Sequence, residues 1–210
     1  IPDEPKSEFA RYCLSHGKHL MLEKPFWVPN EHDFTTLQEL ARANKAVCYT
    51  AYNHRFEPHF VKMRDLIKSG KLGRIYRCRM FYGNGTAMDV KKSKWRDFGL
   101  GVISDLTPHL IDLMIFTIGL KKITDIKLIK VSNFENNAPD HSIISFFYGN
   151  IFVELEASLC SWRNNFKYDI YTKLNSFHVN SLYKWGHGSY KRYSRVLPSG
   201  NPKKFEIKNK

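Results

Sequence analysis

The stretch His19-Leu20-Met21-Leu22-Glu23-Lys24-Pro25 decides the fold of the first part of this chain. Its apolar residues predict a short strand over residues 19–23, which stops where a charged pair meets a proline. A helix is predicted before it, from Pro5 to Gly17, and Asn30 is expected to cap a second helix after it. Another strand, 47–51, follows. This helix–strand–helix–strand order with short connections is typical of a parallel sheet.

The pattern changes after residue 56, where we expect a domain boundary. The next predicted elements are a helix, a strand, a polar loop and an apolar helix, at 58–68, 75–82, 83–101 and 105–118. Apolar residues then mostly alternate, which predicts five strands, at 123–131, 142–148, 151–158, 167–172 and 176–183. The polar tail, 198–210, is expected to fray. The fold class is therefore α/β, with parallel units followed by an α+β domain that has a large, mostly antiparallel sheet.

Bulk composition excludes several classes of protein. The chain has 210 residues, of which 42% are hydrophobic, as in ordinary folded proteins. It has no apolar run of about eighteen residues, so we expect no membrane partner, and no secretory leader is visible. The four cysteines lie far apart, without metal-ligand or redox spacing. This favours buried thiols in a reducing, cytoplasmic compartment and predicts no metal site.

The net charge of +13 is concentrated in two basic blocks, residues 57–100 and 184–210. Such blocks attract nucleic acid or anionic substrates. The chain is also rich in Asn, Ile, Phe and Tyr, which favours a general bias towards lysine over a selected patch. No zinc finger, RNP-like aromatic motif or arginine-rich helix accompanies the charge. We therefore expect no nucleic-acid partner, and a basic nucleic-acid-binding module stays a remote alternative.

Lys24 is a candidate catalytic residue because it lies at the end of a predicted strand. Pro25 biases Lys24 towards an extended backbone. Open α/β sheets bind ligands at the carboxyl ends of their strands, where an ammonium can stabilise charge that develops on oxygen. Taken alone, Glu23-Lys24-Pro25 is explained better by a surface lysine in an ordinary turn than by a catalytic lysine.

Asp105 and His109 are candidates at the start of the apolar helix. Proline is tolerated only in the first turn of a helix, so Pro108 fixes the helix start between Ser104 and Thr107. The positive end of the helix dipole disfavours the imidazolium, so we expect a neutral His109 that can accept a proton near pH 7. Asp105 could bind the same ligand. A capping aspartate beside a half-buried histidine is an equally good interpretation.

Two further polar segments could contact a ligand. Trp95-Arg96 could stack on and hydrogen-bond a ligand, although another basic residue in a basic loop explains them equally well. Asn53-His54-Arg55 follows the second predicted parallel strand and would project into the same crevice. His54 and His59 are expected to be structural or exposed rather than ligands.

Taken together, these segments resemble the glucose–fructose oxidoreductase / inositol dehydrogenase (Gfo/Idh/MocA) family of NAD(P)-dependent sugar oxidoreductases. Matching segments occur in the same order over roughly the first 120 residues. They are Ile1-Pro2-Asp3, Gly17-Lys18-His19, Glu23-Lys24-Pro25, Asn53-His54-Arg55-Phe56, Gly70-Lys71-Leu72-Gly73, Trp95-Arg96, Gly99-Leu100-Gly101, Asp105, His109 and Asp112. The resemblance implies the C-terminal part of a Rossmann-type NAD(P)-binding sheet in 1–56. It also implies a substrate-binding α/β domain with an open sheet, incomplete at its C-terminus, in 57–210.

The resemblance also implies roles for the matching residues. Lys24 would touch both the nicotinamide ribose and the substrate, His109 would be the acid/base, and Asp105 would hold the reacting sugar. Arg55 is expected to join them in binding substrate. The positions that match residues near the NAD or NADP cofactor are Pro2, Glu23, Lys24, Pro25, Asn53, Trp95 and Arg96. We further expect a homo-oligomer that assembles through the open sheet.

The implied activity is hydride transfer between nicotinamide and a hydroxyl or keto carbon of a sugar, cyclitol or nucleotide sugar. The family's Gly-rich phosphate loop has no counterpart in the sequence, so we expect an N-terminally truncated fragment that is inactive alone. The alternative is a catalytically inactive cofactor- or sugar-binding regulator of the same fold. The presence of Lys24, Asp105 and His109 argues against it.

Overall fold

The fold is that of a computed structural model, in which residues 5–28, 30–186 and 188–208 are described. The chain divides into two compact units, Ile1–Asn53 and His54–Lys210. Within the described ranges, no helix is long and apolar enough to cross a lipid bilayer.

The first unit is a small parallel α/β unit. Its elements are α1 (Lys6–Ser15), β1 (Leu20–Leu22), α2 (Glu31–Ala43) and β2 (Cys48–Thr50). β1 and β2 pair in parallel, with Leu22 opposite Thr50, so their carboxyl ends lie at the same edge. The side chain of Asn30 accepts the backbone N–H of Asp33 at 2.9 Å, which satisfies a free donor at the start of α2. The predicted parallel order and the Asn30 cap are confirmed.

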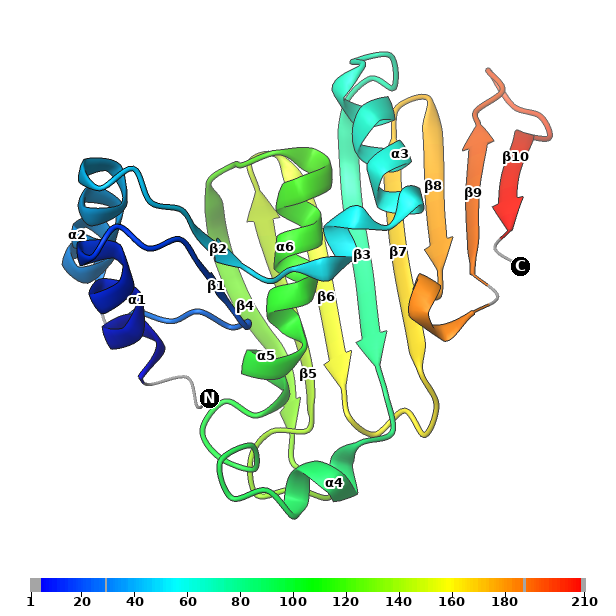
Figure 1. The fold of residues 1–210 in the computed structure, drawn as a ribbon. Helices are drawn as coiled ribbons and strands as arrows, with labels where there is room; N and C mark the ends of the chain where they lie inside the picture. Colours follow the sequence, from blue (N-terminus) through cyan, green and yellow to red (C-terminus); the bar gives the residue numbers. More distant parts are fainter. Residues whose placement is uncertain (1–4, 29, 187, 209–210) are drawn as a thin grey trace. The chain divides into compact units, whose positions relative to one another are not determined.

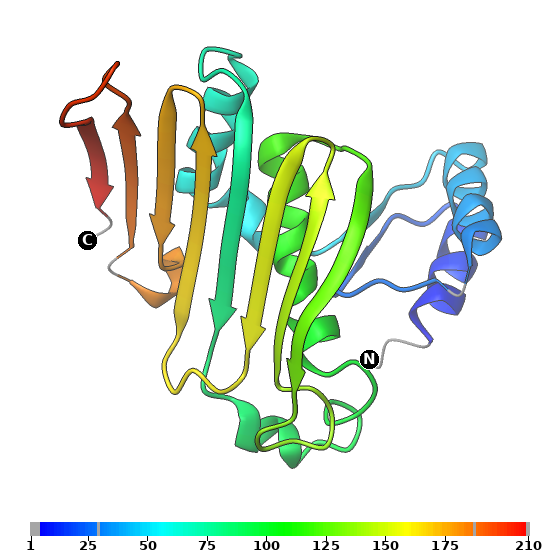
Figure 2. The ribbon, with the colours of Figure 1, turned by 180° about the vertical axis from the view of Figure 1, so that it is seen from behind.

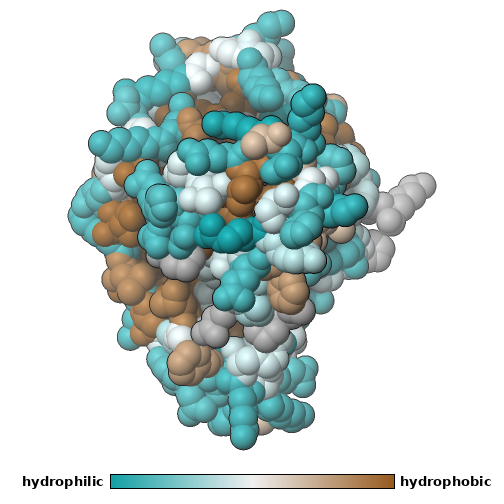
Figure 3. All heavy atoms as spheres, turned by 60° about the vertical axis from the view of Figure 1, so that its left-hand side comes forward, coloured by the Kyte–Doolittle hydropathy of each residue, from teal (hydrophilic) through white to brown (hydrophobic). Residues whose placement is uncertain are grey.

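The core of the first unit is small. Its buried hydrophobic residues are Ala10, Leu14, Leu22, Leu37 and Ala46. Larger hydrophobic side chains stay exposed, among them Phe9, Tyr12, Met21 and Trp27. A unit of this length buries only part of its apolar surface, because the surface of a small body is large relative to its volume. Figure 3 shows one face of the molecule, on which hydrophobic residues interrupt the hydrophilic surface.

The second unit is a large sheet with helices on one face (Figures 1 and 2). Its helices and 3₁₀ turns begin at the boundary and are η1 (Asn53–Phe56), α3 (Pro58–Lys68), α4 (Ala87–Lys91), α5 (Val102–Asp105), α6 (Thr107–Ile118) and η2 (Tyr183–Trp185). Its strands are β3 (Ile75–Gly83), β4 (Ile123–Ser132), β5 (His141–Tyr148), β6 (Ile151–Ser158), β7 (Asn165–Thr172), β8 (Asn175–Asn180), β9 (Ser189–Ser194) and β10 (Lys203–Lys208).

The strand order of this sheet is β10-β9-β8-β7-β3-β6-β5-β4. β3 pairs in parallel with β6, whereas the other neighbouring strands pair antiparallel. The predicted large, mostly antiparallel sheet is confirmed.

The two faces of this sheet have different environments. Cys78, Met80 and Tyr82 of β3 are buried on the face that packs against α3 and α6. Arg77 and Arg79 alternate with them and point to the opposite face, which the described helices leave uncovered in Figure 2. The period of two therefore separates an apolar face from a charged face.

The expectation that the tail frays is wrong for residues 203–208, because β10 pairs with β9 along its whole length. The strand is hard to recognise in the sequence because it has only two apolar residues, Phe205 and Ile207, among charged ones, as in many edge strands. Phe205 lies under the ammonium of Lys62 from α3, with 4.5 Å between the nitrogen and the ring centroid. This contact fixes the apolar side of β10 on the helix-covered face.

Candidate active site

Lys24 projects from a turn that a buried lysine holds in place. Nζ of Lys6 donates hydrogen bonds to the carbonyl oxygens of Pro25 at 3.0 Å and Lys24 at 3.4 Å. Lys6 and Pro25 are buried, Lys24 is half-buried and Glu23 is exposed. A buried ammonium needs such acceptors, so Lys6 fixes the backbone from which Lys24 leaves the end of β1.

His109 lies in the first turn of α6, as predicted. The helix begins at Thr107, and Pro108 is accommodated in its first turn. The ring centroid of His109 lies 5.1 Å from that of His54 and 5.6 Å from that of Tyr82. The half-buried imidazole is therefore flanked by two aromatic rings at the positive end of the α6 dipole.

A hydrogen bond to Glu57 supports the buried His54 ring. Nδ1 of His54 lies 2.7 Å from Oε1 of Glu57, and the other carboxylate oxygen of Glu57 accepts the backbone N–H of Tyr183 at 3.0 Å. Glu57 thereby ties η1 to η2 and fixes the ring that packs beside His109. The expectation that His54 is structural or exposed is met by a structural role, and His59 is also buried.

Asp105 forms an ion pair with Arg96. Nη2 of Arg96 donates to Oδ2 of Asp105 at 3.1 Å, and both side chains are half-buried. Trp95, next to Arg96, is exposed. The structure therefore brings together two residues for which the sequence predicted different roles, cofactor binding and catalysis.

Tyr82, at the end of β3, is a residue of this site that sequence reasoning missed. Its hydroxyl accepts a hydrogen bond from Nζ of Lys184 at 3.3 Å, and its ring meets Trp185 edge-on. Burial raises the pKa of Tyr82, and the carboxylates of Asp105 and Glu57 raise it further. The phenol is thus protonated at neutral pH and can donate a hydrogen bond. The only signal in the sequence is its place near the end of a predicted strand that leads into a glycine-containing loop.

Arg55, predicted to bind substrate, binds Asp112 of α6. Nε of Arg55 donates to Oδ2 of Asp112 at 2.8 Å and to Oδ1 at 3.0 Å, and its Nη2 also contacts Oδ1. Asp112 is buried, so the guanidinium compensates a carboxylate that has lost its water. The pair fixes η1 against α6.

The second unit thus gathers Arg96, Asp105, His109 and Tyr82 around the start of α6. Glu23, Lys24, Pro25 and Asn53 belong to the first unit, and Pro2 lies outside the described residues. In the described part of the chain, no cluster of three or more His, Cys, Asp or Glu side chains could hold a metal ion.

Comparison with known proteins identifies the family. Residues 60–178 match the model of the GFO/IDH/MocA C-terminal domain. The scyllo-inositol 2-dehydrogenase (NADP(+)) IolW of Bacillus subtilis is 26% identical over 174 residues, which are 81% of this chain and 47% of that protein.

Two solved structures share the fold. An inositol dehydrogenase homolog from Azotobacter vinelandii, complexed with NADH and myo-inositol, matches 98% of this chain and 54% of that chain, with 19% identity and a TM-score of 0.79. Levoglucosan dehydrogenase in complex with NADH and levoglucosan matches 100% and 59%, with 18% identity and a TM-score of 0.81. The chain spans between about a third and a half of the length of the curated relatives that it matches. Because the family model covers more than half of the chain, including α3, α6 and the centre of the large sheet, the chain belongs to the GFO/IDH/MocA family of oxidoreductases.

Proposed function

We propose that the protein is an NAD(P)-dependent oxidoreductase that transfers a hydride between nicotinamide and a hydroxyl or keto carbon of a sugar, cyclitol or nucleotide sugar. The observation that carries the proposal is the arrangement at the start of α6. There a half-buried imidazole, His109, follows Asp105 of the Arg96–Asp105 ion pair by four residues and lies beside the protonated phenol of Tyr82. The relatives named for inositol and levoglucosan support a polyol as the substrate.

The donor groups of the first unit fit the nicotinamide end of a dinucleotide. The carboxyl ends of β1 and β2 lie at one edge, which is where open α/β sheets bind ligands. Glu23-Lys24-Pro25 follows β1 and Asn53 follows β2, so charged and amide groups are available for ribose and carboxamide. We propose that these residues, with Trp95 and Arg96, hold NAD or NADP. The bound nicotinamide would supply a two-electron acceptor for the hydride.

In the proposed mechanism His109 accepts the proton of the substrate hydroxyl while the carbon that bears it loses a hydride and becomes a carbonyl. The helix dipole favours the neutral imidazole that this step requires. Asp105, oriented by Arg96, accepts hydrogen bonds from the substrate, and Lys24 stabilises the charge that develops on oxygen. Reduction follows the same path in reverse.

Turnover of the full-length protein tests this assignment. We expect His109→Ala to lower turnover by about two to four orders of magnitude, measured as the change in NAD(P)H absorbance with a panel of polyols. His32→Ala, at an exposed position of α2, is the control and should leave turnover unchanged. Near-normal turnover in His109→Ala would remove His109 as the general base. Binding of NADH without any substrate-dependent change in the wild type would instead indicate a regulator.

We also propose that the protein self-associates through the charged face of the large sheet. Phe147 and Phe152 are exposed on this face with their ring centroids 5.7 Å apart, and the same face carries the Arg77–Glu154 ion pair and the hydrogen-bonded His178–Asp169 pair. A partner that covered this face would bury apolar rings and match charge with charge. Phe152→Glu should shift the sedimentation coefficient towards that of the monomer, whereas an unchanged coefficient would contradict the proposal.

A further inference from the structure

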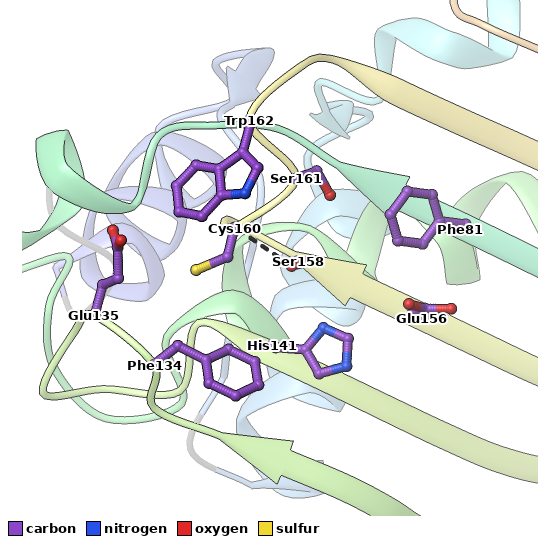
Figure 4. Close-up of a pocket in the computed structure, with 9 residues that line it drawn as sticks. All are labelled: Phe81, Phe134, Glu135, His141, Glu156, Ser158, Cys160, Ser161 and Trp162. Carbon is purple, nitrogen blue, oxygen red and sulfur yellow. Dashed lines mark hydrogen bonds between the residues drawn. The ribbon is translucent and has the colours of Figure 1, made fainter.

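A cavity of about 530 Å³ lies at the ends of β5 and β6, on the face of the sheet that the helices leave uncovered (Figure 4). Its walls combine aromatic rings with carboxylates. The residues that matter here are Phe81, Phe134, Glu135, Glu156, Cys160 and Trp162. None of these residues has a part in the mechanism proposed above.

Two exposed aromatic rings flank the cavity. Phe134 is 66% exposed and Trp162 is 72% exposed. Figure 4 places them on either side of Cys160, with the carboxylate of Glu135 beside them. Water covers most of both rings, and the ring of Phe134 also contacts that of His141, with 5.8 Å between the ring centroids.

The backbone around Trp162 adopts an unfavourable conformation. Its φ is 55°, in the left-handed region that bulky residues rarely adopt. The chain approaches Gly85 so closely that a Cβ there would lie 3.1 Å from backbone atoms of Trp162. Such outliers cluster at functional sites, where the surrounding structure enforces them.

The loop that carries Phe134 and Glu135 is fixed from beneath. The carboxylate of Asp140, which is fully buried, accepts the backbone N–H groups of Phe134 at 2.9 Å, Glu135 at 2.6 Å and Asn136 at 3.1 Å. Asp97 adds a bond from the backbone N–H of Ala138 at 2.8 Å. The ring and the carboxylate are therefore positioned before any ligand arrives.

Glu135 offers an unused acceptor. Its Oε2 is shielded from solvent and has no hydrogen-bond partner among the described residues. A carboxylate oxygen in that state lacks the compensation that burial requires. Burial raises the pKa of the Cys160 thiol to about 11, and the charges of Asp140 and Glu135 raise it as well. The cavity is lined by the carboxylates of Glu135 and Glu156 and by the imidazole of His141, in a chain whose net charge is +13.

We propose that this cavity binds an organic cation, a primary ammonium or a guanidinium. Its charge would lie against Glu135, and its alkyl or planar part would lie between the rings of Phe134 and Trp162. Glu156, which is opposite Phe81 in the sheet register, adds a second carboxylate on the far side of the cavity. A free amine and a Lys or Arg side chain of a second copy share this chemistry.

Calorimetric titration of the full chain with n-butylammonium chloride tests the proposal for a free amine. Binding should saturate, and it should weaken about tenfold or more in Glu135→Gln, which keeps the shape of the side chain and removes its charge. Trp162→Ala should weaken binding about three- to thirtyfold. Asp89→Asn removes an exposed carboxylate of α4 and is the matched control, expected to leave affinity unchanged.

Sedimentation equilibrium tests the second source of the cation. If a side chain of a second copy fills the cavity, n-butylammonium should shift dimer towards monomer, and Glu135→Gln should weaken association about tenfold while Asp89→Asn does not. Saturable binding lost in Glu135→Gln, or association lost in it, supports the proposal. Equal n-butylammonium affinity in Glu135→Gln and wild type would overturn it. The absence of saturable binding, together with unchanged association in Glu135→Gln, would overturn it too.

Discussion

Breaking the Arg55–Asp112 ion pair should destabilise the second unit far more than breaking a similar pair on the uncovered face of the sheet. The side chains of Arg55 and Asp112 are 34% and 6% exposed. The comparison pair is Arg77–Glu154, in which Nε and Nη2 of the arginine also contact a carboxylate, with exposures of 44% and 30%. The two pairs share their chemistry and differ in how completely the acid has lost its water.

Arg55→Ala leaves the Asp112 carboxylate buried without this partner, which costs about 3 kcal/mol or more in a dry site. Because a third of the Arg55 side chain is exposed, water already screens part of its charge, and we expect a loss of about 2 kcal/mol. Arg77→Ala should cost no more than about 1 kcal/mol. With a urea dependence of about 2 kcal/mol per molar, the first change lowers the unfolding midpoint by about 1 M and the second by less than about 0.5 M.

Urea unfolding of the full chain, followed by far-ultraviolet circular dichroism and tryptophan fluorescence, measures both midpoints. Arg55→Met combined with Asp112→Leu should recover most of the lost stability, because it removes the buried charge together with its partner. Equal midpoints for Arg55→Ala and Arg77→Ala would refute the reasoning from burial.

Two further predictions concern backbone geometry and thiol chemistry. Gly101 has a φ of 49°, and a Cβ there would lie 2.2 Å from the carbonyl oxygen of Pro139. Gly101→Ala should therefore lower the melting temperature by several degrees more than Gly99→Ala. At Gly99 φ is 61°, but no atom lies within 4 Å of the position that a Cβ would take. Equal decreases in the melting temperature, measured by calorimetry, would contradict this prediction. Cys160 has its pKa raised to about 11, so its thiol stays protonated below that pH. Iodoacetamide should alkylate Cys160 at pH 8 roughly a hundredfold more slowly than it alkylates an ordinary thiol, and the rate should increase as the pH rises. Mass spectrometry would measure the rate of alkylation. A rate at pH 8 equal to that of an ordinary thiol would contradict the prediction.

The fold could be predicted where caps and periodicity agree. Asn30 and Pro108 each mark a helix start by a mechanism that acts within one turn, so the sequence alone suffices. The tail could not be predicted, because β10 depends on pairing with β9 and on the Lys62–Phe205 contact. Both are tertiary interactions that the local, mostly polar sequence does not indicate.

Part of the candidate site could likewise be predicted from the sequence, and part of it could not. A helix start alone suggests Asp105 and His109 as candidates, whereas the Arg96–Asp105 pair joins the segment between β3 and α5 to that start and needed the structure. In the sequence Tyr82 resembles a core residue, because it continues the alternation of buried and exposed residues along β3. Its hydroxyl accepts a hydrogen bond from Lys184, 102 residues away in the chain, which no local pattern connects to it.

Hydride transfer itself is the most direct measurement of the proposed chemistry. The full-length protein would be incubated with NADH or NADPH deuterated at C4 and with keto forms of inositol or levoglucosan, the compounds for which its relatives are named. We expect one deuterium on the new carbinol carbon, detected by mass spectrometry, and about two to four orders of magnitude less in His109→Ala at equal times. Cofactor that binds while no deuterium reaches any product, or equal transfer in His109→Ala, would contradict the catalytic role of this site.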